Sequence, residues 1–229
     1  MSTLELIKTR HSVRMYTPEP LRAEHVRLLN EHIELLNGKS GVRFFLIQDS
    51  PAAFDSFLGR YGKFSNARNF FVLAGKKGER AEEEAGYYGE DLVLKAEELG
   101  LGTCWVGGTY SKKDIPLEAD EKIICVITVG YAAQPGSPRR SKWPSDVVSN
   151  TGDLPEWFSR GVEAALLAPT ALNQQKFMFS LEAASPATGD KPVVSARVSG
   201  FGVFTRLDLG IAKYHFEAGA GRENFVWKE

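Results

Sequence analysis

The stretch GEDLVLKAEELGLG, residues 89–102, decides how the rest of the sequence is interpreted. Its apolar residues Leu92, Ala96 and Leu99 recur at helical spacing, and the glycines that follow end the helix. The stretch DLGIAKYHFEAGAG, residues 208–221, aligns with it without a gap, and each ends in Gly-x-Gly. The match is degenerate enough to arise by chance. It nevertheless suggests an internal duplication, in which two related halves pack as a pseudo-symmetric dimer within one chain.

The same order of elements is predicted on either side of a long connection. Before it, apolar runs and helical spacing predict a short helix begun by the capping-box pair Ser2 and Glu5, a helix ended by Gly38, strands at 42–47 and 70–75, a helix at 87–99, and strands at 101–108 and 122–130. After it, they predict a helix at 157–167, strands at 176–183 and 192–199, and a helix at 205–218. We therefore predict an α+β fold, a mixed sheet flanked by helices. Its halves are residues 1–131 and 155–229, joined by a basic, Pro- and Ser-rich loop at 132–154.

The composition excludes several classes of protein. The chain has 229 residues, is 43% hydrophobic and carries a net charge of -1, so no global field attracts nucleic acid or lipid. No apolar run approaches the ~20 residues of a membrane helix, and the amino terminus lacks a signal-peptide core. We expect a cytoplasmic protein without nucleic-acid or membrane partners. Cys104 and Cys125 lie in apolar runs and are expected to be buried free thiols.

The first candidate site is the segment RHSVR, residues 10–14. The two arginines, a hydroxyl and an imidazole can together surround a phosphate with charge-assisted hydrogen bonds. Arg140 and Lys142, in the long loop, are spaced so that both can reach the same anion. Taken alone, the segment is more often a solvated cationic turn, and the loop cations are more often surface charge.

Two further stretches favour a planar ligand. APTALNQQKF, residues 168–177, offers hydroxyl and amide groups that suit the edge of a heteroaromatic ring, although ordinary turn chemistry after a helix explains it equally well. Gly107 and Gly108 follow a buried strand, where missing side chains let a flat ligand approach the backbone. Taken alone, that pair is better explained as a tight turn.

Other kinds of chemistry find no support in the sequence. His25 and His32 have no cysteine or carboxylate at ligand spacing, so no metal site is predicted. There is no G-x-S-x-G nucleophile motif, Walker lysine or G-x-G-x-x-G fingerprint.

Together these stretches resemble the FMN-dependent nitroreductase family, and in particular its duplicated single-chain branch. RHSVR is similar to the family's R-x-S-x-R motif, and APTALNQQKF resembles A-P-S-x-x-N-x-Q-P-W. AEELGLGTCWVGG, residues 96–108, resembles A-x-x-L-G-L-G-x-x-x-x-G-G, and VGY at 129–131 precedes a basic Pro-rich loop as in the family. Each motif is weak alone, whereas four in a consistent order are moderately specific. The resemblance implies a nitroreductase-like fold with FMN as cofactor and NAD(P)H as electron donor.

The resemblance also implies which residues hold FMN. The phosphate would be held by Arg10, Ser12 and Arg14, aided by Arg140 or Lys142, with His11 supporting the ribityl chain or ring edge through its backbone. The second half would contribute Pro169, Thr170, Ala171 and Asn173. The ring would meet Val106, Gly107, the Gly108 N–H near flavin N5, and Asn66. No side chain is assigned a catalytic role, because the flavin itself carries the electrons.

The two halves are complementary in these motifs. The first has RHSVR and VGG but lacks the A-P-S-x-x-N segment, and the second has APTALNQQ but lacks R-x-S-x-R. We therefore predict one flavin site between the halves, with its symmetry mate lost, in a monomer that is a pseudo-dimer or associates further. Gln175, Lys176 and Phe177 replace the family's Q-P-W, and Thr170 and Ala171 replace small hydroxyl residues, so the family's substrates do not transfer directly. The expected reaction is ping-pong reduction of a nitroaromatic or quinone; the alternative is a flavin-binding protein without turnover.

Overall fold

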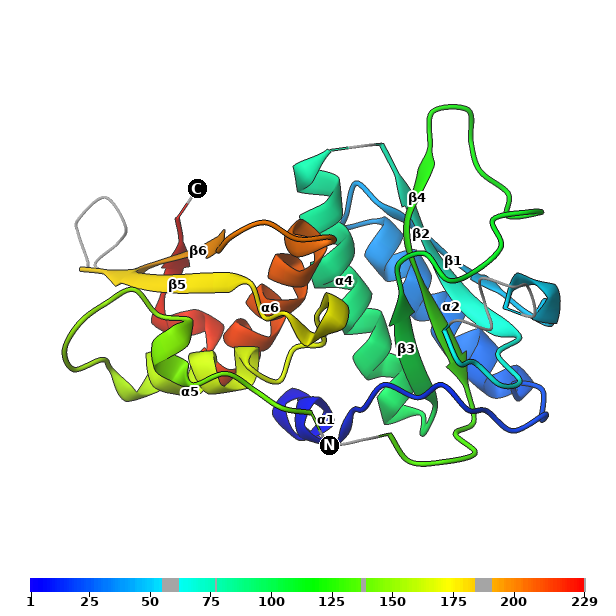
Figure 1. The fold of residues 1–229 in the computed structure, drawn as a ribbon, viewed down its shortest axis with the longest axis horizontal. Coiled ribbons are helices and arrows are strands. Elements are labelled where there is room, and N and C mark those ends of the chain that lie inside the picture. The colour runs from blue at the N-terminus through cyan, green and yellow to red at the C-terminus, as the bar shows by residue number, and fades with distance from the viewer. Residues whose placement is uncertain (55–61, 77, 137–138, 184–190, 229) are drawn as a thin grey trace.

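The computed structural model describes residues 1–54, 62–76, 78–136, 139–183 and 191–228. Its α-helices include α1 (Thr3–Thr9), α2 (Ala23–Asn37), α4 (Glu79–Glu98), α5 (Glu156–Ala165) and α6 (Thr205–Ala220). Its strands include β1 (Arg43–Ile47), β2 (Asn69–Gly75), β3 (Gly102–Val106), β4 (Lys122–Gly130), β5 (Phe177–Glu182), β6 (Val193–Val198) and β7 (Val226–Trp227). The fold is α+β, as the sequence predicts (Figure 1). Most elements lie within a few residues of their predicted limits, whereas α4 begins at Glu79, well before the predicted start at residue 87.

The first part of the chain builds a four-stranded sheet in the order β1-β2-β4-β3, whose pairings are all antiparallel. Period-2 alternation divides the strand side chains between two faces. Phe71, Leu73 and Ile127 point to the face covered by α2 and α4. Phe70 and Val126 point to the opposite face, where the described residues packed against them include Val13, Tyr16 and Phe54. Val13 belongs to the RHSVR segment, so the fold fixes the candidate phosphate-binding segment against the sheet.

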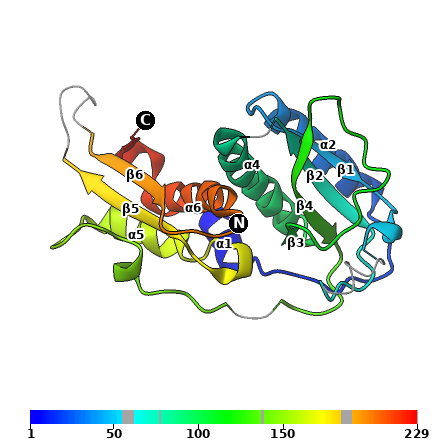
Figure 2. The same cartoon turned by 45° about the horizontal axis from the view of Figure 1, so that its top comes forward.

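The second part forms a separate, smaller layer. β5 and β6 pair antiparallel, and β7 adds to β6 in parallel, which makes this sheet mixed. Helices α5 and α6 pack against it around an aromatic core, in which the Phe179 and Phe216 rings stack with centroids 4.7 Å apart. β7 is absent from our sequence-based prediction, because two residues give no readable alternation. Figure 2 shows this layer and the four-stranded layer on opposite sides of the α4–α6 pair.

The two layers meet where α4 and α6 cross, and two glycines set this contact. A β-carbon on Gly86 would lie 2.0 Å from the Leu207 carbonyl oxygen, and one on Gly210 would lie 2.0 Å from the Glu83 carbonyl oxygen. The helices therefore touch backbone to backbone, in a reciprocal way. The contacts at this crossing make Gly86 the counterpart of Gly210. The gapless alignment of 89–102 with 208–221 would instead make Gly86 the counterpart of Thr205.

Local signals in the sequence explain several boundaries. The predicted capping box forms, since the Ser2 N–H donates to the Glu5 carboxylate and the Glu5 N–H donates to the Ser2 hydroxyl. Helix α2 ends at Gly38, as predicted. Helix α4 begins at Glu79, within the acidic stretch that suits a helix amino terminus. Cys104 and Cys125 are buried and free.

Candidate functional site

The RHSVR segment leaves α1 at its C-cap, Arg10, and runs beside β3. Ser12 forms an isolated parallel β-bridge with Thr103, and the Val13 N–H donates to the Thr103 carbonyl at 2.8 Å. Val13 turns inward against Gly102, so its neighbours Ser12 and Arg14 face the other way. The backbone is thus anchored through one side chain while the polar ones stay available.

The APT segment follows α5 and turns sharply through the short 3-10 helix Ala171–Asn173. Leu172 has a left-handed φ of 53°, and the buried carboxylate of Asp208 accepts the Ala171 N–H at 3.0 Å. The Gln175 N–H donates to the Thr170 hydroxyl at 3.1 Å. These hydrogen bonds hold the segment from α6 and from within itself.

The long loop joins the two segments. The Arg139 guanidinium donates to the carbonyl oxygens of Arg10, at 2.6 Å, and Leu167. The Asn173 amide donates to the Arg140 carbonyl at 2.7 Å. The sequence-based prediction of the phosphate site includes Arg140 but not its neighbour Arg139.

Two adjoining cavities lie between these segments. The larger, about 440 Å³, is lined by the predicted site residues Arg10, His11, Ser12, Arg14, Arg140, Pro169, Thr170 and Asn173, together with Arg139, Ala168 and Leu172. The smaller, about 130 Å³, shares Ser12, Arg14, Pro169, Thr170 and Leu172 with it. It adds mostly apolar groups: Cys104, Trp105, Gly107, Cys125, Ala171, Phe204, Leu207, Asp208 and Ile211. We call them the basic cavity and the ring cavity.

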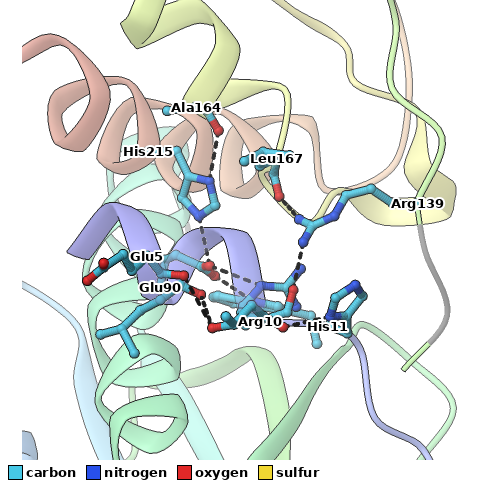
Figure 3. A network of polar contacts seen from close by, with 11 residues as sticks. Glu5, Arg10, His11, Glu90, Arg139, Ala164, Leu167 and His215 are labelled. Atoms are coloured by element: carbon cyan, nitrogen blue, oxygen red, sulfur yellow. Dashed lines mark hydrogen bonds and ion pairs between the residues drawn. The ribbon is translucent and has the colours of Figure 1, made fainter. Parts of the chain in front are cut away.

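The arginines of the basic cavity keep donors available. Among the residues that the structure describes, no hydrogen bond is formed by the guanidinium groups of Arg10, Arg14 or Arg140. Arg10 is 3% exposed, and its Nε lies 3.7 Å from a carboxylate oxygen of Glu90 without a hydrogen bond (Figure 3). A buried guanidinium with unused donors is costly unless an anion completes it. An anionic ligand therefore fits this cavity.

The glycine pair is divided between two roles. A β-carbon on Gly107 would lie 2.3 Å from the Phe204 ring, whereas one on Gly108 would meet no atom within 4 Å. Gly107 thus makes room for Phe204 while lining the ring cavity, and the β-carbon side of Gly108 is open. Phe204 is a site residue that the sequence analysis missed, because aromatic residues between strands and helices are usually core.

Four predicted residues line neither cavity: Asn66, Val106, Gly108 and Lys142. The Asn66 amide donates to the Tyr16 carbonyl at 3.0 Å, and the Lys142 ammonium donates to the Gln175 carbonyl at 2.8 Å. Val106 ends β3 directly before the glycine pair. Contacts of these four residues with a ligand stay predictions.

Asp208 is the clearest titratable group that the sequence analysis missed. It is 1% exposed, lines the ring cavity, and has no ion-pair partner among the described residues. Burial raises its pKa to about 6, although hydrogen bonds from Gln174 and Ala171 oppose the shift. A signal was present, since Asp208 stands between Leu207 and Ile211 on an otherwise apolar helix face.

A four-stranded antiparallel layer and a smaller aromatic layer, packed through a close helix pair with a basic cavity at one end, define a protein of the nitroreductase-like α+β class. The chain belongs to the family described as "Putative TM nitroreductase", whose model matches residues 2–220. No helix among the described residues is long and apolar enough to cross a membrane.

Solved structures have the same fold. A protein from Thermotoga maritima, described as a putative nitroreductase, is 23% identical with a TM-score of 0.63, and the match covers 96% of this chain and 83% of that one. A putative nitroreductase from Desulfovibrio desulfuricans, solved in complex with FMN, is 24% identical with a TM-score of 0.54, covering 66% and 98%. A nitroreductase family protein from Streptococcus pneumoniae is 16% identical with a TM-score of 0.53, covering 65% and 99%.

Proposed function

We propose that this chain is an FMN-dependent oxidoreductase that uses NAD(P)H to reduce a small electron-poor acceptor such as a nitroaromatic or a quinone. The observation that carries the proposal is the basic cavity, in which Arg10 and Arg14 hold unused donors directly beside a smaller cavity that adds aromatic and aliphatic side chains. A ligand with a phosphate at one end and a flat ring at the other would place the phosphate in the basic cavity and the ring in the ring cavity. The relative solved with FMN supports this choice of ligand.

The chain's own residues would bind and orient the cofactor. Arg10, Arg14 and Arg140 would hold the phosphate through charge-assisted hydrogen bonds, with the Ser12 hydroxyl completing the set. Pro169 and Thr170 line both cavities and would flank the link between phosphate and ring. The Gly108 N–H, next in the chain to the cavity-lining Gly107, would meet the ring edge. Bound FMN would supply the two-electron chemistry in a ping-pong exchange with hydride transfer through its N5 atom.

We also propose that the chain is a pseudo-dimer with a single flavin site. The reciprocal contact of Gly86 and Gly210 supports a local two-fold relation between α4 and α6. The basic cavity lies at one end of that helix pair in the described structure, and RHSVR occurs once in the sequence. A single chain would then complete its site without a partner subunit, whether or not it associates further.

An absorbance spectrum of the purified protein tests the function directly. We expect a flavin spectrum, native or after FMN is added, at close to one flavin per chain, and anaerobic NADH or NADPH should bleach it. A flavin that stays oxidised with both donors would favour the alternative, a flavin-binding protein used for storage or sensing. A colourless protein that ignores added FMN would overturn the proposal, and a ratio near two would overturn the single site.

A further inference from the structure

A buried polar network lies beneath Arg10 and connects both parts of the chain (Figure 3). Glu90 of α4 and His215 of α6 are both fully buried, with Glu90 Oε1 2.9 Å from His215 Nε2. The Trp105 indole donates to the other Glu90 oxygen at 3.0 Å. On the far side of the imidazole, Nδ1 lies 3.1 Å from the Ala164 carbonyl oxygen. His215 lines neither cavity, yet it is linked to Arg10 through Glu90.

The hydrogen bonds fix how many hydrogens the pair holds. A carbonyl oxygen can only accept, so His215 Nδ1 must carry a hydrogen to bond with Ala164. The contact between Nε2 and the Glu90 carboxyl also needs one hydrogen, carried either by the nitrogen or by the oxygen. With one hydrogen fewer, two lone pairs would face each other in a buried site, which is unfavourable.

Both arrangements give the same net charge. With the hydrogen on His215, the cluster holds two cations, Arg10 and His215, and one anion, Glu90. With the hydrogen on Glu90, only Arg10 is charged. The cluster is therefore +1 in either case. Burial and then the charge of Arg10 lower the pKa of the neighbouring Arg139 to about 10, and Glu90 opposes that shift.

We propose that His215 is a positioning residue for the anion in the basic cavity. By supplying the hydrogen that offsets the charge of Glu90, it lets Glu90 orient Arg10 without neutralising the floor of the cavity. The identity of the anion as the FMN phosphate rests on the proposed function. The electrostatic role of His215 applies to any anion bound there.

Four proteins test this, namely the wild type, H215Q, E90Q and the double variant E90Q/H215Q. The cluster charge is +1 in all except H215Q, where a charged Glu90 faces Arg10 and the net charge is zero. Glutamine is uncharged and can bond at either position. Sulfate is a suitable probe because its charge is constant at neutral pH, and FMN is the second probe. Both affinities are measured by calorimetry on flavin-free protein, with thermal unfolding as a check of folding.

We expect H215Q to bind sulfate and FMN about tenfold more weakly, since one charge is lost within a poorly screened interior. Adding E90Q should restore the affinity to near the wild-type value. A purely structural role predicts the opposite, a double variant no better than the weaker single one. That result, or unchanged affinity in H215Q, would overturn the inference.

Two further outcomes separate this inference from the proposed function. If H215Q does not fold, E90Q alone decides, because the charge argument expects binding at least near the wild-type strength and a tenfold loss contradicts it. If the wild type binds sulfate but not FMN, the function fails while the four-way comparison with sulfate still tests His215. If it binds neither, both are wrong.

Discussion

The two ends of the α4–α6 pair occupy matching positions but carry different chemistry. At the basic end, Leu207, Asp208 and Ile211 of α6 line the ring cavity. In the register set by Gly86 and Gly210, their counterparts on α4 are Glu83, Glu84 and Tyr87, and these line a surface pocket of about 260 Å³ at the other end. We call this the paired end.

The charges of the paired end bind one another. Glu217 accepts from the Tyr87 hydroxyl at 2.6 Å and from the Trp227 indole at 2.5 Å, and it also pairs with Arg222. Lys213 pairs with Glu83 and lies over the Trp227 ring. No comparable set of bonds uses the guanidinium donors of Arg10 and Arg14 among the described residues. One helix crossing therefore supports one end with free donors and one end whose polar groups are already satisfied.

The largest expected effect concerns the crossing itself. G86A and G210A should each destabilise the protein by about 3 kcal/mol, because each new methyl group meets a backbone carbonyl that cannot move unless the helices separate. Chemical denaturation measures both. Equal losses of unfolding free energy in the two variants would support the two-fold relation between the helices. Clearly unequal losses would contradict it.

Gly78 provides the matched control for these variants. A β-carbon there would meet no atom within 4 Å, and the residue is the N-cap of the same helix. G78A should cost only about 0.5 kcal/mol. A loss as large as that of G86A would mean that the added methyl group destabilises the protein without any contact at the crossing.

The second prediction sharpens the contrast between the two ends. Asp208 is buried without a cation in the described structure, whereas Glu84, its counterpart, is partly exposed and pairs with Arg80. Because the folded pKa of Asp208 is raised to about 6 from 3.8, the folded state binds more protons between these values. This group therefore lowers stability as the pH rises from about 4 to 6, by about 2–3 kcal/mol.

The variant D208N isolates that contribution. Urea denaturation at several pH values should show D208N gaining stability relative to the wild type at pH 7, with the gain disappearing near pH 4. Asparagine keeps an oxygen that can accept the Ala171 N–H, so the APT turn is expected to persist. A stability difference that is independent of pH would show that the carboxyl is not perturbed by its burial.

Local patterns predicted the elements and many of the cavity residues, because they depend on neighbours in the sequence. Helical spacing in α4, the capping box at Ser2 and the polar groups of residues 168–175 are all of this kind. Glu90, His215 and Phe204 could not be predicted in this way. Their roles depend on which helix faces which, and that depends on the backbone contact at Gly86 and Gly210.

The smallest expected effect tests whether Gly107 and Gly108 have different roles. G107A should cost about 1–2 kcal/mol in ligand-free protein, since its methyl group would overlap the Phe204 ring, a side chain that can partly give way. G108A, with open space around it, should change the stability by less than about 0.5 kcal/mol.

A double-mutant cycle identifies Phe204 as the cause. In the F204A background the cost of G107A should fall by about 1 kcal/mol, because residues in contact are energetically coupled and this change removes the overlapping ring. A cost that is unchanged in that background would place the obstacle elsewhere, and Gly107 would then return to the role first predicted for it, that of admitting the ligand ring. Coupling to Phe204 would instead make this aromatic side chain a wall of the ring cavity. At the paired end, Arg80 is the counterpart of Phe204 in the glycine register, and it is exposed and pairs with Glu84.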